Sequence, residues 1–430
     1  MAIRVNPKLI DDLEKYGSED VSNCYHCGNC SAVCLHTKDP FMFPRRPMRG
    51  LQMGLESKLK HSLEPWLCYY CGQCSEQCPR DAEPGETMMG LRRWLTARYD
   101  VTGISRLTYR SWKFDLLFIL VLGALTCAGL LLYGFTHGDI HDYDGPNAFL
   151  PVGFVHLFDL GLAVVLISLV VANSARMWWF TIGSRKAIKV PILHYLRGVY
   201  LLPLHFFTQK RFAQCGSKTL WALHLVLVLS YLTMLLLISF FLAQMQAGPE
   251  INWAVHVFGY LAAIGILGTT IFMLHGRLKQ NRAQFKHTHS SDWMFLFLLL
   301  YVCATGVLQH VLHRTGLNLW ANVVYVAHLM GVVAWLSRVL NKWSHLAYRP
   351  LAMFFGDLMA APLLATKKMP EIAQMLQPAR GPKDIPDTVA LPSAGAAGVS
   401  RYASRGKSTG SRADPSLSCI ETHARKLQRV

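Results

Sequence analysis

Long apolar stretches dominate the chain after residue 113. Six of them are long enough, as helices rising about 1.5 Å per residue, to cross about 30 Å of hydrocarbon. They run over residues 114–135, 152–173, 219–243, 252–274, 293–313 and 319–340. The pattern predicts a six-helix transmembrane bundle, which we assign to a membrane domain of residues 101–360.

The first hundred residues have a different pattern, with short apolar patches between polar stretches. Leu9, Ile10 and Leu13 form a small amphipathic patch that we expect to pack on the rest of this region. Helices are predicted over residues 48–59 and 86–98. The second helix has apolar residues on one side and basic residues on the other, namely Arg92, Arg93 and Arg98. We therefore expect a helical domain of residues 1–100 whose last helix leads to the membrane, and a mainly α fold overall.

Two further segments differ from the spans in composition. Residues 191–212 mix aliphatic and aromatic residues with basic ones, which predicts an amphipathic helix. It could lie at the membrane surface or against the N-terminal domain. Past about residue 376 the chain is rich in Pro, Gly, Ser, Ala and Arg. We expect residues 361–430 to form a disordered tail in which Cys419 is incidental.

Composition and charge agree with membrane insertion. The chain is 52% hydrophobic and 16% charged, unlike a soluble protein. Its formal net charge of +17 could suggest nucleic-acid binding. However, outside the loops between the spans there is no basic helix and no segment of alternating aromatic and basic residues of the kind that binds nucleic acid. Nucleic acid is therefore not expected as a partner.

The distribution of charge predicts the orientation of the spans. Basic residues precede the first span and fill the second-to-third and fourth-to-fifth loops, whereas the first-to-second loop carries Asp139, Asp142 and Asp144. The positive-inside rule places both termini and the N-terminal domain in the cytoplasm. The expected location is the cytoplasmic membrane of a bacterium or archaeon, with several crossings of the lipid bilayer.

Eight of the twelve cysteines lie in two runs with the spacing Cys-x2-Cys-x2-Cys-x3-Cys. This is the bacterial pattern for [4Fe–4S] clusters, in which three close thiolates bind one cluster and the fourth binds the other. The first cluster is therefore expected on Cys24, Cys27, Cys30 and Cys78. The second is expected on Cys68, Cys71, Cys74 and Cys34.

Zinc and disulfides are the alternatives for these cysteines. A zinc site would use two Cys-x2-Cys pairs and leave the third and fourth cysteines of each run idle. Disulfides within eleven residues would close cramped loops, and residues at the N-terminus do not resemble a signal peptide, so a reducing compartment is expected. Leu35 follows the first run where Pro79 follows the second. Ligation is unaffected, because that proline only shapes the turn.

Histidines near the ends of the spans form two layers, as two stacked haems would require. A haem b between helices needs two imidazoles that face each other at one depth. For the inner, cytoplasmic layer the favoured pair is His224 with His345, and His275 is the competitor. The third span also offers an apolar and aromatic face for a porphyrin.

The haem ligands of the outer histidine layer are less well defined. His328 lies well inside its span and is expected to bind the outer haem, with His156, His256 or His310 as its undecided partner. His328 and His345 are 17 residues apart. On one continuous helix they would be separated by about 25 Å, so that helix could serve both layers.

Structural roles are favoured for the remaining histidine, cysteine and methionine candidates. His313 beside Arg314, and His137 and His141 in the acidic loop, are expected to interact with headgroups or carbonyls. Cys127 and Cys303 are expected to pack within spans. Met234 could ligate haem, but packing is favoured.

Taken together, these motifs resemble the membrane subunits of quinone-interacting membrane-bound oxidoreductase complexes of sulfur-metabolising bacteria. In that family a heterodisulfide-reductase-like two-cluster domain is fused to a cytochrome b similar to the nitrate reductase gamma subunit. The resemblance covers about residues 15–360. It rests on the paired cysteine runs, on residues 84–94, and on the last span from Ala327-His328-Leu329 through Ser344-His345-Leu346-Ala347-Tyr348-Arg349.

The resemblance implies two haems b and a quinone, with menaquinone as the expected species. It also implies soluble flavoprotein partners similar to the flavoprotein of heterodisulfide reductase, linked to adenylylsulfate reductase. It supports His224, His328 and His345 as haem ligands and leaves the fourth ligand open, because the position near Met234 is not histidine. The direction of electron flow is not determined by it.

Missing motifs narrow the function further. There is no dinucleotide-binding glycine fingerprint, so the flavin is expected on a partner, and no Cys-Cys-Gly element for disulfide chemistry.

The hypothesis is an electron-transfer subunit of a quinone-interacting oxidoreductase, with no catalytic residue assigned. A heterodisulfide- or lactate-type complex and a membrane anchor with structural clusters are the alternatives. The quinone could bind near Trp178, Trp179 and Arg185 or near the acidic loop.

Overall fold

The computed structural model describes residues 4–18, 20–37, 41–138, 149–184, 192–215, 217–246 and 252–366. Nearly all of these residues lie in helices, turns and connecting loops, which confirms the mainly α prediction. Residues Met1–Ala360 form one compact unit. The acidic loop with His141, Arg185, and residues 367–430, which include Cys419, lie outside the described residues. Residues 361–366, predicted as the start of the disordered tail, are helical.

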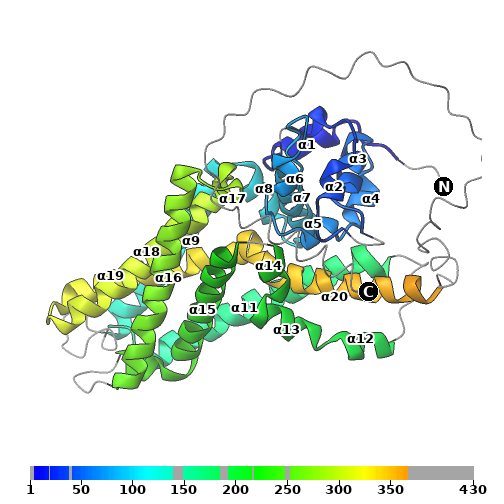
Figure 1. Cartoon of the computed structure of the whole chain (residues 1–430). Helices are drawn as coiled ribbons and strands as arrows, with labels where there is room; N and C mark the ends of the chain where they lie inside the picture. The colour runs from blue at the N-terminus through cyan, green and yellow to red at the C-terminus, as the bar shows by residue number, and fades with distance from the viewer. Residues whose placement is uncertain are drawn as a thin grey trace, which may run out of the picture. The chain divides into compact units, whose positions relative to one another are not determined.

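Short helices surround one long helix in the N-terminal domain (Figure 1). The long helix is α7 (Pro84–Tyr99), which confirms the helix predicted over residues 86–98. Leu9 and Leu13 of α1 are buried with Trp66 and Trp94 in the domain core, as expected for the N-terminal patch. The other helices are α1 (Leu9–Glu14), η1 (Asp20–Asn23), α2 (Asn29–Ala32), α3 (Arg45–Gln52), α4 (Glu56–Lys60), α5 (Glu64–Leu67) and α6 (Gln73–Glu76).

Two details of the predicted domain were wrong. The helix expected over residues 48–59 is split into α3 and α4 by a turn at Gly54, whose φ is 62°. The basic side of α7 is not exposed, because Arg92 and Arg93 are buried. Their guanidinium groups are satisfied by backbone carbonyls and carboxylates, which a charge pattern alone does not show.

Six long helices form the bundle and confirm the six predicted spans as those of a multi-pass membrane protein. Helix α19 packs most extensively, against α18 and α9, and α15 packs along α16 (Figure 1). Side chains such as Leu132 and Leu157 are 69–70% exposed, as expected for residues that face lipid. The six are α9 (Trp112–His137), α11 (Val152–Trp178), α15 (Lys218–Gln246), α16 (Trp253–Lys279), α18 (Ser290–Arg314) and α19 (Asn318–Leu336).

The last span does not continue to His345, contrary to prediction. Helix α19 ends at Leu336 and is followed by η3 (Ser337–Leu340), η4 (Lys342–Ser344) and α20 (His345–Thr366). The break lies at Asn341, whose φ of −134° and ψ of −91° are not helical and whose side chain caps the next turn. His328 and His345 therefore lie on different helices, and the axial separation of about 25 Å along one helix does not apply.

A buried ion pair joins the start of the first span to the end of the last. Arg338 Nη1 donates to Asp115 Oδ1 at 2.5 Å, and each side chain is 1% exposed. Both charges lie in segments that were predicted only as apolar spans. Arg338 also donates to the Ser337 hydroxyl. The pair ties α9 to η3, directly before the break at Asn341.

The segment after α11 forms several short helices rather than one amphipathic helix. They are a π-helical turn η2 (Trp179–Gly183), α12 (Ile192–Gly198), α13 (Leu201–Thr208), α14 (Lys210–Cys215) and the connecting turns. The ring of Phe212 stacks on Tyr69 of the N-terminal domain with centroids 5.8 Å apart. Tyr195 packs edge-on against Phe354 of α20. Packing against the N-terminal domain, one of the two predicted positions, is observed at Phe212. The remaining helices are α8 (Ile104–Arg110) and α17 (Ala283–Lys286).

Candidate redox-cofactor sites

The two cysteine runs have the same backbone conformation. The second residue after the first cysteine, His26 or Tyr70, has positive φ, and so does the glycine after the second cysteine. That glycine, Gly28 or Gly72, adopts φ near 88–89° and begins a short helix. Glycine suits the position because it carries no Cβ. The chain therefore curls in the same way in both runs.

The second run forms an enclosed site. Cys34 from the first run lines the same cavity as the three closely spaced cysteines of the second run, Cys68, Cys71 and Cys74. Burial and the neighbouring Cys68 and Cys34 thiols raise the pKa of Cys71 to about 11. Burial also raises the pKa of Cys74, which feels the thiols of Cys68, Cys71 and Cys34. Ligation by a metal would deprotonate these thiols.

The first run forms a more open site. Burial, followed by the charge of Cys24, raises the pKa of Cys30 to about 11, and Cys27 adds to this effect. Asn29 donates to the carbonyl of Gln77 at 2.6 Å, so residues adjacent to Cys30 and Cys78 are bonded to each other. This contact brings the end of the second run to the first loop.

Backbone amides point at the sulfurs in both loops. The amide of His26 donates to Cys24 Sγ at 3.5 Å, and the amide of Tyr70 donates to Cys68 Sγ at 3.3 Å. Among the described residues, no three His, Cys, Asp or Glu side chains converge closely enough to hold a single metal ion.

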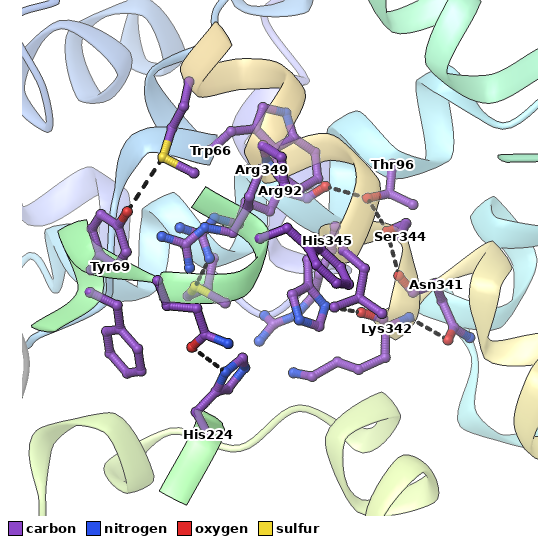
Figure 2. Close-up of a pocket in the computed structure, with 18 of the residues that line it drawn as sticks. Trp66, Tyr69, Arg92, Thr96, His224, Asn341, Lys342, Ser344, His345 and Arg349 are labelled. Carbon is purple, nitrogen blue, oxygen red and sulfur yellow. Dashed lines mark hydrogen bonds between the residues drawn. The ribbon is translucent and has the colours of Figure 1, made fainter. Parts of the chain in front are cut away.

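A larger cavity lies between the N-terminal domain and the bundle end that carries His224, which we call the domain-side end. His224 of α15 and His345 at the start of α20 both line it (Figure 2). Their ring centroids are 6.4 Å apart. The predicted competitor, His275, is exposed and does not line this cavity. The cavity has a volume of about 260 Å³.

Each of the two histidines has one nitrogen engaged in a hydrogen bond. His224 Nδ1 donates to Gln209 Oε1 at 2.8 Å, and His345 Nδ1 donates to the carbonyl of Lys342 (Figure 2). These bonds fix the tautomer and leave Nε2 of each ring as a bare electron pair. Metal-binding histidines are commonly oriented in this way.

The cavity wall is strongly basic. Four cationic side chains line it, and Asp292 is the one carboxylate among its described lining residues; the cations are Arg92, Arg93, Lys342 and Arg349. Arg92 joins the cavity directly to the second cysteine loop, because its guanidinium donates to the carbonyls of Pro65 and Cys68. The guanidinium carbon of Arg349 lies 4.1 Å from the ring centroid of Tyr69, the residue after Cys68.

The far end of the bundle has a different arrangement. His328 Nδ1 bonds to Thr305 Oγ1 at 3.0 Å, and its ring fits against Gly306, where a Cβ would lie 3.1 Å from it. No described ring contact joins His328 to His156, His256 or His310. Instead the ring centroids of His256 and His310 lie 5.3 Å apart. His256 Nδ1 bonds to the carbonyl of Asn252, and its Nε2 accepts from Arg314 at 3.2 Å.

The other candidates occupy packed or exposed positions. Met234 and Cys303 pack around Trp335, and Cys127 packs in a second apolar core, as predicted. His137 is exposed and bonds to Thr136. Trp178 and Trp179, proposed to border a quinone, are also exposed and do not line the domain-side cavity.

Sequence reasoning missed most of the cavity wall. Arg92 was assigned only to the basic side of the helix predicted over residues 86–98, and Lys342 and Arg349 were not assigned any role. A usable signal was present, since ionisable residues that flank a span beside a histidine are candidates for a buried site. Asp292 gives the same signal, because it lies in the first turn of α18.

Comparison with known proteins identifies the N-terminal region. Residues 20–82 match the family described as "4Fe-4S dicluster domain". The N-terminal domain is a 4Fe–4S dicluster domain. No curated protein matches the chain, and no solved structure matches it. An iron–sulfur domain of this kind joined to six membrane helices is an electron-transfer module of the oxidoreductase type.

Proposed function

We propose that this protein relays electrons between membrane quinone and a soluble redox partner through two [4Fe–4S] clusters and haem b. The observation that carries the proposal is the pair of opposed histidines, His224 and His345, beside the second cysteine loop. A structural role for the clusters alone would not require such a pair at a membrane boundary.

The ligands proposed for the clusters follow from the grouping of the thiols. Cys68, Cys71, Cys74 and Cys34 are assigned to the enclosed second site, since all four line one cavity. Cys24, Cys27, Cys30 and Cys78 are assigned to the first site, supported by the contact between Asn29 and Gln77. Each cluster supplies reversible one-electron transfer, and the protein sets its potential through burial and amide-to-sulfur hydrogen bonds.

The separation of His224 and His345 suits a single iron between them. Metal–imidazole bonds of about 2 Å, with about 1 Å more to each ring centre, put the centres of two opposed imidazoles about 6 Å apart. The observed 6.4 Å agrees with this value. The basic wall, with Arg92 and Arg349, suits the two carboxylates of a haem.

The second cluster site and the histidine pair are linked by few atoms. Arg92 contacts the carbonyl of Cys68 and lines the histidine cavity. Tyr69 also lines this cavity, and its hydroxyl donates to Met353 at 3.5 Å. In this proposal Arg92 and Tyr69 hold the two centres close together and exclude water between them.

The proposal for the far end is less complete. His328 is proposed as ligand of a second haem b through Nε2, because its Nδ1 is bonded to Thr305, whereas Nε2 of His256 is already bonded to Arg314. His156 and His310 remain candidates for its partner. The quinone, the flavoprotein partner, the link to adenylylsulfate reductase and the cytoplasmic position of the cluster domain are proposed from the family resemblance and the charge of the loops.

The test is cofactor analysis of the purified full-length protein. We expect about eight irons in cluster form per chain, EPR signals of two reduced [4Fe–4S] clusters, and the optical spectrum of a low-spin b-type haem after reduction. Oxidation of the reduced haem by a menaquinone analogue should follow. A protein with both clusters and no b-type spectrum would overturn the proposal.

A further inference from the structure

The two cysteine loops share one backbone shape but differ in what covers them. The second loop is closed by α17: a Cβ at Gly72 would lie 2.2 Å from Ala283 Cβ, and Gln284 donates to the carbonyl of Cys71 at 3.1 Å. Cys68 and Cys74 are buried. This loop therefore faces the rest of the protein and has little surface for a partner.

The first loop faces outward. Cys27 is exposed, and the ring of Tyr25 between the first two cysteines is 70% exposed. The loop is held from behind, where Gln52 donates to the carbonyl of Cys24 at 3.0 Å. The apolar cores of the described structure do not include Tyr25.

Arginine side chains border the exposed loop on both sides. The guanidinium of Arg80 lies 4.2 Å over the ring of Tyr25. Arg45 lies against Gly28, where a Cβ would be 3.2 Å from its Nη1. Both arginines are exposed, and neither has an ion-pair partner among the described residues. The first loop thus presents a redox site inside a basic rim.

Nearby carboxylates form no ion pair with Arg45 or Arg80 among the described residues. The carboxylate of Asp20 accepts a hydrogen bond from the side chain of Asn23 at 3.4 Å. Glu64 is paired with Arg46 at 2.5 Å. The charges of Arg45 and Arg80 are therefore available to an incoming protein.

We propose that the first cysteine loop, bordered by Arg45 and Arg80, is the docking site of a soluble one-electron redox protein with an acidic face. The inference rests on the proposed function, because it needs a cluster in the loop. Redox partners bind transiently over small areas, and opposite charges steer their encounter. Tyr25 and Cys27 then provide the closest approach to the first cluster.

The test uses the full-length protein with both clusters and an acidic plant-type ferredoxin as the probe. The second-order rate of cluster reduction is measured by stopped flow at low and high salt. Arg45→Glu combined with Arg80→Glu should lower this rate about tenfold or more at low salt, with the difference shrinking as salt rises. The extent of cluster reduction by excess dithionite, which needs no protein docking, should be unchanged.

A matched control is Lys8→Glu with Lys58→Glu, two exposed lysines with no described contact to the first loop. The lysine double variant changes the net charge by the same amount as the arginine double variant, and it should retain most of the rate of cluster reduction by ferredoxin. Equal losses in both double variants, or no loss in the arginine variant, would overturn the docking proposal. Cluster EPR of each variant is recorded first. Missing cluster signals in the unmodified protein would instead contradict the proposed function.

Discussion

The two ends of the helical bundle hold their histidines in different ways. At the domain-side end, His224 and His345 come from different helices, face each other across a cavity, and each present a free Nε2. At the far end, His328 faces Thr305, while His256 and His310 form a separate contact. Histidines arranged in two layers therefore do not imply two equal sites.

The difference shows that the surroundings of a histidine decide whether it can bind a metal. His224 and His345 are oriented by oxygens that accept from Nδ1, so the opposite nitrogen is available. His256 is oriented in the same way, by Asn252, but Arg314 donates to its other nitrogen. A histidine in that state can bind iron only after the arginine moves away.

The largest expected effect comes from the domain-side pair. His345→Ala should abolish the low-spin haem proposed for this site, because one of its two proposed axial ligands is lost. The measurement is haem content per chain with the optical and EPR spectra of the purified variant. His275→Ala is the matched control, and its haem content should stay at the level of the unmodified protein. Unchanged haem in His345→Ala would remove this site from the relay.

Next in size is the effect of His328→Ala, which should remove one haem and leave the domain-side haem intact. His256→Gln is expected to leave haem content unchanged, because His256 Nε2 is already bonded to Arg314. Haem content and redox titration of both variants separate these outcomes. If His256→Gln lost the same haem as His328→Ala, then Arg314 would have to release His256 when haem binds.

A smaller change is expected for Arg349→Gln, which removes a positive charge from the domain-side cavity. A cation stabilises the reduced haem, so its removal should lower the reduction potential of that haem, on the order of 50 mV for a charge about 10 Å away in a medium of intermediate dielectric. Arg314→Gln, at the far end, should change that potential much less. Optical redox titration provides the comparison, and equal shifts in both variants would show that the two ends are not electrically distinct.

The smallest effect concerns the contact between the cluster domain and α17. Burial opposes ionisation of Glu83, but the bond from Lys286 and the charge of His287 lower the pKa of this carboxyl below its ordinary value. Its contribution to stability is therefore complete above pH about 5 and is lost as the pH falls through the lowered pKa. Because Lys286 is largely exposed, the effect should stay below about 1 kcal/mol.

Thermal unfolding between pH 3 and 6 measures this contribution. The Glu83→Gln variant should lose the part of the pH dependence that comes from the contact with α17. Glu76→Gln, which changes an exposed carboxylate without a described ion pair, is the control. Identical pH profiles for Glu83→Gln and the unmodified protein would show that the contact does not contribute to stability.

The sequence was sufficient to predict features with strong local signals. The six spans follow from uninterrupted apolar runs, and the dicluster domain follows from the spacing of eight cysteines, later matched over residues 20–82. The domain-side pair of His224 and His345 could be chosen because each lies at a span end near other aromatic residues. Whether they bind haem remains a prediction.

Features that depend on tertiary contacts could not be predicted in this way. The break at Asn341 requires an unusual ψ, and no proline or glycine marks it. The burial of Arg92 depends on carbonyls of Pro65 and Cys68, which are distant in the sequence. The bond from Arg314 to His256 joins two helices that hydropathy cannot orient about their axes.

The ion pair between Asp115 and Arg338 has a consequence for biosynthesis. The two residues are 223 positions apart, so Asp115 enters the bilayer with the first span long before its partner is translated. An ionised carboxylate inside a membrane is costly, which favours retention of the nascent first span beside the translocon until the sixth span arrives. Chains truncated before residue 338 should consequently be degraded rather than accumulate as stable fragments.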